Sequence, residues 1–198
     1  MLLAAGFNVL GGIDYLVLTL RGSVRPNRVT WLVWALAPLI AFAAELGQGV
    51  GLPAVMTFMV GFMPLLILVA TFVNRSGAWR LGRLDVVCGA LSLIGLGLWA
   101  LTRVGNVAIV LSILADFLAA VPTIVKAFQR PDTEGARIYA CAAVSASITL
   151  LTIHDWTFSQ YAFPVYILAI CIPIFGLVRF RIGSRIMSAD AGRVSGVG

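Results

Sequence analysis

The stretch DFLAAVPTIVKAFQRPDTEGAR, Asp116 to Arg137, puts an acid and a proline inside a long apolar run and then continues into a charged loop. A carboxylate at the centre of a membrane costs at least about 2–3 kcal/mol, and a proline inside a helix removes a backbone hydrogen bond. Neighbouring helices or a water-filled cavity must therefore compensate for Asp116 and Pro122.

The composition of the whole chain indicates a membrane protein. Of its 198 residues, 61% are hydrophobic and 11% are charged, and the mean hydropathy is +1.02. Soluble domains carry about a quarter charged residues, and no polar stretch here is long enough to form one. The net charge of +6 comes from short loops between apolar runs, so we expect membrane lipid as a partner and no nucleic acid.

Apolar segments of membrane-spanning length, about 20 residues, follow one another along the chain. They are residues 2–20, 29–47, 53–73, 84–102, 106–128, 138–154 and 159–178. If all seven segments span the membrane, every Lys and Arg except Arg103 falls on one side of the membrane. Because cytoplasmic loops are enriched in positive residues, we expect the N-terminus outside and the C-terminus in the cytoplasm. Lys126 is the only lysine among many arginines, which is typical of a GC-rich bacterial genome, so we expect the bacterial inner membrane.

A shift of 105 residues aligns two parts of the chain. Residues 20–21 then fall on 125–126, and Arg25-Pro26-Asn27 falls on Arg130-Pro131-Asp132. Three spans invert the chain, and one further span restores its orientation, so two parallel repeats need a linker helix. We therefore expect an all-α fold in a 3+1+3 arrangement: a first three-helix repeat in 1–79, a linker helix in 80–104, a second repeat in 105–181 and a flexible cytoplasmic tail in 182–198.

The second repeat carries a recognisable motif. Pro122 to Lys126, PTIVK, followed by Thr133-Glu134-Gly135, resembles the PQ-loop signature of the SWEET and cystinosin-like superfamily. The first copy departs from the signature and is more similar to uncharacterised bacterial seven-span relatives. The resemblance implies a 3+1+3 helical bundle and a transporter.

Two acids are the first candidates for a site. Asp116 lies ten residues before Lys126, about 15 Å along a helix, which is near the membrane centre. There it could bind a proton or a solute, or it could be a structural acid bonded to a neighbouring helix. Asp116 aligns with Gly11 in the repeat, so Asp14 is one turn away on the equivalent helix. Both acids could face one central pathway.

Smaller polar residues extend the candidate site. Ser112 and Thr123 share a helix face with Asp116, and Tyr166 could line an outer vestibule. Ser145 and Thr149 belong to a weakly polar stripe with Cys141 and Thr152. The alternative for this stripe is that its hydroxyls bond to carbonyl groups of their own helix.

Prolines and tryptophans inside the spans are candidates for hinges and for a gate. Pro122 and Pro38 could act as hinges or as static kinks. Trp31 and Trp34, at the inner start of the second span, could form an inner gate, or they could anchor the helix at the membrane interface.

The sequence contains no catalytic constellation, no glycine-rich phosphate loop and no metal-ligand spacing. We therefore expect neither enzyme activity nor a cofactor or metal. We expect a transporter of a small polar or organic solute that works by alternating access, with proton coupling as an option. The alternative is a non-transporting membrane receptor or assembly partner with the same fold. One chain could form a pathway alone, and a homo-oligomer remains open.

Overall fold

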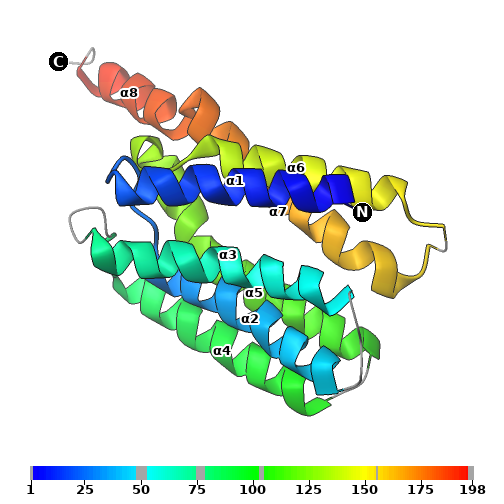
Figure 1. Ribbon diagram of the computed structural model, residues 1–198. Coiled ribbons are helices and arrows are strands. Elements are labelled where there is room, and N and C mark those ends of the chain that lie inside the picture. Colours follow the sequence, from blue (N-terminus) through cyan, green and yellow to red (C-terminus); the bar gives the residue numbers. More distant parts are fainter. Residues whose placement is uncertain (1, 48–52, 75–78, 103–104, 155, 196–198) are drawn as a thin grey trace.

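The computed structural model describes residues 2–47, 53–74, 79–102, 105–154 and 156–195 (Figure 1). These residues form helices and no strand, so the predicted all-α class is confirmed. The helices are α1 (Leu2–Leu20), α2 (Arg28–Gly47), α3 (Pro53–Val73), α4 (Arg83–Thr102), α5 (Gly105–Gln129), α6 (Ala136–Leu151), α7 (Phe158–Phe180) and α8 (Ile182–Ser195), with a short 3-10 turn, η2 (Pro131–Thr133), before α6.

The first seven helices coincide with the seven predicted segments to within three residues at each end. Local chemistry explains several of these boundaries. Pro53 opens α3, where its missing N–H is not needed. The side-chain oxygen of Asn27 accepts hydrogen bonds from the backbone of Val29 (3.0 Å) and Thr30 (3.4 Å) and so caps the start of α2.

Two helices have the character of membrane spans. Within the described residues, Leu3–Leu20 and Tyr161–Phe180 are long and apolar enough to cross a membrane, whereas Arg28–Leu39, Phe58–Val73 and Ala136–Leu151 are apolar but shorter. Large hydrophobic side chains also stay exposed along the bundle, for example Val86 and Ile94 on α4, each 59% exposed. Extended apolar surface of this kind marks contact with membrane or with protein.

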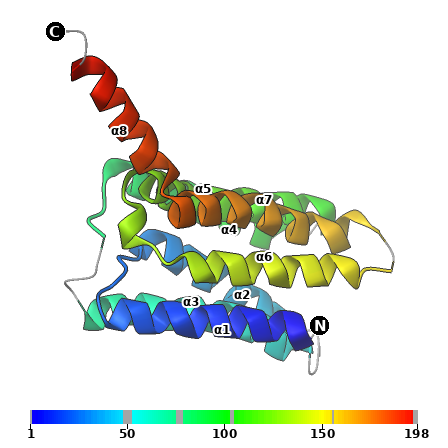
Figure 2. The same cartoon turned by 90° about the horizontal axis from the view of Figure 1, so that it is seen from above.

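The helices pack in a matching order in two halves, α1–α3 and α5–α7. In the first half α3 contacts both α1 and α2, and in the second half α7 contacts both α5 and α6. Between the halves, α1 contacts α6 and α2 contacts α5, while α4 packs on α5 and α2. Figure 2 shows α6 lying between α1 and α7. The α1–α6 and α2–α5 interfaces therefore join the two halves.

Each half has its own buried core. In the first half the core is built from Tyr15, Val24, Trp31, Ile67 and Leu68. In the second half it consists of Ala120, Ala127, Tyr139, Ile170, Cys171, Ile174 and Val178. Trp34 on α2 and Ile138 on α6 pack against both cores, so they connect the halves.

A glycine allows close approach at the α1–α6 interface. A Cβ built on Gly11 would lie 2.8 Å from the Cβ of Cys141 and 3.2 Å from the Cα of Ile138. Any side chain at position 11 would push the two helices apart. Nearby, Asn8 Nδ2 donates to Ser145 Oγ at 2.7 Å.

The predicted flexible tail is helical over residues 182–195, which form α8. Arg181, in the left-handed region at φ 51°, turns the chain after α7, and α8 then points away from the bundle (Figure 2). Gly183 is buried against the backbone carbonyl of Phe128 at the end of α5, where a Cβ would collide. The small, polar composition suggested disorder, but docking on α5 gives this helix a tertiary contact that composition does not reveal.

Candidate functional site

Asp116 lies where three helices meet, and its carboxyl group has a hydrogen-bond partner on one of them. Tyr166 Oη on α7 donates to Asp116 Oδ2 at 2.5 Å. The ring of Trp34 on α2, like that of Tyr166, packs against the second-half core that contains Ala120, one turn after Asp116, and its Nε1 has no hydrogen-bond partner among the described residues. Cys171 on α7 belongs to the same core. We refer to these four residues as the Asp116 cluster.

The Asp116 cluster has an acid but no fixed cation. Within the described ranges, the ion pairs involve other acids, and no Lys or Arg pairs with Asp116. Its neighbours are a phenol, an indole and a thiol. A carboxyl group held only by neutral groups can accept a proton or bind a cationic or hydrogen-bonding solute. The predicted site residues Asp116 and Tyr166 are therefore brought together in a chemically useful way.

Asp14 lies elsewhere in the bundle. Its Oδ1 accepts a hydrogen bond from Arg137 Nη1 on α6 at 3.0 Å. The Arg137 side chain is 80% exposed and the Asp14 side chain 28% exposed, so this ion pair lies at the edge of the α1–α6 interface. Within the described part of the chain, Asp14 therefore has a counter-ion and Asp116 has none, and the two acids bind different partners.

Thr123 takes part in the α2–α5 interface. Its hydroxyl donates to Thr30 Oγ1 at 3.2 Å, and Thr30 Oγ1 donates to the carbonyl of Ala119 at 2.7 Å. Ala119 lies one turn before Pro122, where the proline disturbs the helical hydrogen bonds. A side chain of the first half thus supports the proline region of the second half. Whether Pro122 and Pro38 move as hinges stays a prediction.

The polar stripe on α6 is occupied by structural contacts. Ser145 accepts the hydrogen bond from Asn8 across the interface. Thr149 Oγ1 donates to the carbonyl of Ser145 at 2.9 Å, one turn back in its own helix, as the alternative interpretation of the stripe expected. The side chain of Ser112 lies outside the described residues.

Trp31 and Trp34 form part of a line of aromatic rings inside the bundle. The ring of Trp31 lies 4.9 Å from that of Tyr15 and 5.2 Å from that of Trp34. Trp31 is only 2% exposed, so the interface-anchor alternative was wrong for this residue. The anchor interpretation assumed contact with the membrane surface, whereas Trp31 belongs to the core of the first half.

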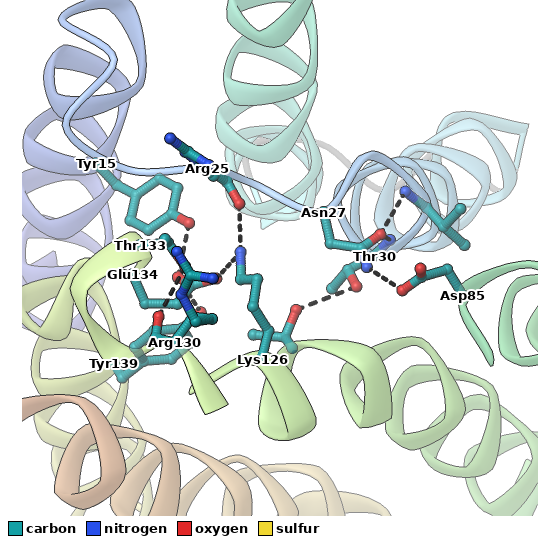
Figure 3. Close-up of polar contacts among 12 residues, drawn as sticks. Tyr15, Arg25, Asn27, Thr30, Asp85, Lys126, Arg130, Thr133, Glu134 and Tyr139 are labelled. Carbon is teal, nitrogen blue, oxygen red and sulfur yellow. Dashed lines mark hydrogen bonds and ion pairs between the residues drawn. The ribbon is translucent and has the colours of Figure 1, made fainter. Parts of the chain in front are cut away.

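A second polar cluster lies at the end of the bundle that carries residues 21–27, 79–82 and 130–135, here called the basic end (Figure 3). Lys126 and Glu134 form an ion pair there, and both side chains are 0% exposed. Glu134 Oε2 also accepts hydrogen bonds from Tyr15 Oη (2.8 Å) and Tyr139 Oη (3.1 Å). Lys126 Nζ donates to the backbone carbonyl of Arg25. These five residues are the Lys126–Glu134 cluster.

Sequence reasoning missed this cluster. From the sequence, Lys126 is grouped with the cations of the loops, and Glu134 appears only as part of the Thr133-Glu134-Gly135 motif. A signal existed, because Lys126 is flanked by Val125, Ala127 and Phe128 and therefore lies in an apolar context. A lysine surrounded in this way needs a buried partner.

The loop between α1 and α2 makes polar contacts of its own. Asn27 Nδ2 donates to Asp85 Oδ1 at 2.5 Å, and the backbone N–H of Gly82 donates to Asp85 Oδ2. Both Asn27 and Asp85 are buried. This contact fastens the start of α4 to the start of α2, whereas Asp132, which a shift of 105 residues aligns with Asn27, is exposed.

Comparison with protein-family models, with curated proteins and with solved structures finds no match for this chain. Among the described residues, no group of three or more His, Cys, Asp and Glu side chains could hold a metal ion. The two polar clusters are therefore the basis for a functional proposal.

Proposed function

We propose that this protein is an integral membrane transporter of a small polar solute, with the Asp116 cluster as its binding site. One observation carries the proposal: Asp116 lies inside an apolar bundle with its carboxyl group hydrogen-bonded to Tyr166, and no Lys or Arg of the described residues pairs with it. Ionisable groups inside membrane helices are expensive, and they typically mark a pathway for a solute or a proton.

The proposed topology has seven spans, α1 to α7, in a 3+1+3 arrangement of two parallel repeats joined by α4. The matching contacts of α1–α3 and α5–α7 support it, and so does the resemblance of residues 122–135 to the PQ-loop signature. The exposed apolar side chains would face lipid. The positive-inside rule then puts the basic end and α8 in the cytoplasm, with a bacterial inner membrane as the proposed location.

In the proposed cycle the two halves rock against each other around the Asp116 cluster. The close contact at Gly11 would act as the pivot of the α1–α6 interface. Solute would reach Asp116 by separation of the halves along α2 and α5. Asp116 would bind the solute directly or carry a proton with it, which is how an intramembrane acid couples transport to a proton gradient.

Flux through proteoliposomes tests this proposal. The purified protein is reconstituted with a pH-sensitive dye inside, and a panel of monosaccharides, amino acids, amines and organic acids is applied with and without a proton gradient. We expect uptake of at least one solute class and loss of that uptake in Asp116→Asn. The matched control is Asp132→Asn, the same substitution at an acid whose side chain is 59% exposed.

Two results would contradict the proposal. Uptake that is equal in wild type and Asp116→Asn would remove Asp116 from the pathway. A solute that raises the melting temperature of the protein but never crosses the membrane would instead support the receptor alternative.

A further inference from the structure

We propose that the Lys126–Glu134 cluster is the gate that closes the basic end of the bundle, and that the ion pair must be released from its first-half partners when the site opens to that side. The importance of this gate rests on the proposed transport function. Its test measures opening directly and needs no solute.

The cluster joins the two halves of the chain. Lys126 and Glu134 belong to the second half, but Tyr15 and Arg25 belong to the first. The backbone N–H of Arg25 also donates to the carbonyl of Thr133 at 2.7 Å. Three hydrogen bonds therefore cross between the halves at one place, and all three must break if the halves separate at the basic end (Figure 3).

Burial makes this contact behave as a switch between two states. Both charged side chains are completely buried, so each depends on the other and on its hydrogen-bond partners for solvation. When the halves are apart, water can hydrate both charges. A partly open state would leave charges neither paired nor hydrated, which is the unfavourable case. We therefore expect two states of the gate: closed, with both charges shielded from water, and open, with both charges hydrated.

Aromatic contacts connect the gate to the Asp116 cluster. The Tyr15 hydroxyl binds Glu134, the Tyr15 ring contacts Trp31, and Trp31 contacts Trp34. Trp34 and Tyr166 pack against the same core, and Tyr166 donates to Asp116. Packed side chains thus lead from the gate to the core beside the proposed binding site, so a solute that displaces Trp34 would also disturb the packing that supports Tyr15.

The gate occurs in only one copy of the repeat. The residues aligned with Lys126 and Glu134 in the first copy are Arg21, which is exposed, and Val29, which has no charge. The first copy therefore cannot form the same ion pair, and the second repeat alone supplies both charges.

The native thiol of Cys171 reports opening, because it is 7% exposed and belongs to the same buried core as Tyr139 and as Ala120, one turn after Asp116. Vesicles with the basic end facing the medium are treated with a membrane-impermeant charged maleimide, and labelling is quantified by peptide mass spectrometry. Cys88 on α4, 6% exposed, serves as an internal reference for loosening of the fold. Wild type should label slowly at both positions.

Two tyrosines give a matched pair of variants. Tyr15 and Tyr139 donate to the same oxygen of Glu134, but only Tyr15 comes from the first half. We expect Tyr15→Phe to raise the labelling rate of Cys171 about tenfold, since a hydrogen bond to a charged group is lost only from the closed state. Tyr139→Phe should change it little, because that bond stays within one half in both states.

A charge variant and its control complete the test. Glu134→Gln should raise Cys171 labelling at least as much as Tyr15→Phe, and the exposed Asp132→Asn should not raise it. Equal rates in Tyr15→Phe and Tyr139→Phe would overturn the gate, as would a parallel rise at Cys88, which would mean general loosening. Selective Cys171 exposure without any solute flux would keep the gate and refute transport, whereas flux with unchanged exposure would refute the gate alone.

Discussion

Tyr166 Oη lies 2.5 Å from Asp116 Oδ2, and this hydrogen bond joins α7 to α5 in the middle of the second half. It gives the half-buried acid a neutral donor, and no Lys or Arg of the described residues pairs with it. The arrangement differs from that of Asp14, whose ion pair with Arg137 neutralises it. Asp14 and Asp116 thus differ in their partners: Asp14 has a paired cation, whereas Asp116 has a neutral donor.

The Tyr166→Phe substitution should destabilise the protein modestly. Hydrogen bonds between membrane helices contribute about 0.6 kcal/mol on average and at most about 1.7, so we expect the free energy of unfolding to fall within that range. Thermal unfolding in detergent measures it. Tyr161→Phe is the control, since the ring of Tyr161 contacts Trp156 and Phe158 rather than Asp116. An equal loss in both variants would contradict a specific Tyr166–Asp116 bond.

The buried ion pair should show strong coupling in stability. Lys126→Met leaves the Glu134 charge buried without its cation, and removal of one partner of a buried pair destabilises by about 3–5 kcal/mol. The double variant Lys126→Met/Glu134→Gln should recover most of this loss, because no unpaired charge remains. Chemical denaturation of both variants and of Glu134→Gln completes the cycle.

An exposed ion pair provides the comparison for that cycle. Arg130 and Asp132 lie 3.9 Å apart with side chains 60% and 59% exposed, so Arg130→Gln should cost less than about 1 kcal/mol. If the double variant is as unstable as Lys126→Met, the loss comes from packing rather than from the unpaired charge.

Two glycines in helices should respond oppositely to the same substitution. Gly11→Ala puts a Cβ 2.8 Å from the Cβ of Cys141, which should lower the free energy of unfolding by about 1–3 kcal/mol. At Gly97 nothing lies within 4 Å, so Gly97→Ala should be neutral or stabilising by up to about 1 kcal/mol through helix propensity. Chemical denaturation of both variants measures these changes in the free energy of unfolding. A neutral Gly11→Ala would refute the close contact of α1 and α6.

Gly183→Ala should detach α8 from the bundle. Its Cβ would collide with the carbonyl oxygen of Phe128, whereas the Cβ of the control Gly176→Ala would meet only Ile182, at 4.0 Å. We expect faster trypsin cleavage after Arg185 in Gly183→Ala and wild-type cleavage in Gly176→Ala. Cleavage that is unchanged in Gly183→Ala would mean that α8 does not depend on this contact.

Helix positions were predictable from the sequence because each apolar run is bounded by proline, glycine or charged residues. Pro53 begins α3, and the Arg-Pro-Asn segment ending at Asn27 begins α2. These signals are local and depend on a few neighbouring residues. The polar tail was misjudged because its helix depends on Gly183 docking against α5, a contact between distant positions.

The site was predictable only in part, since pairing depends on tertiary packing. Asp116 could be recognised because a single acid in an apolar run is unusual, but nothing in the sequence links it to Tyr166, 50 residues away. Lys126 looked like every other cation near a loop. Its burial became apparent only when Glu134, Tyr15 and Arg25 were brought together by the fold.

The docking of α8 on α5 has a mechanical consequence. α5 carries both Asp116 and Lys126, and its last turn holds the base of α8 through Phe128 and Gly183. A helix of 14 residues is about 21 Å long, so a small tilt of α5 would be magnified at the free end of α8. A fluorophore on Ser188, which is exposed, would therefore report movement of α5 at the Asp116 cluster without touching that cluster.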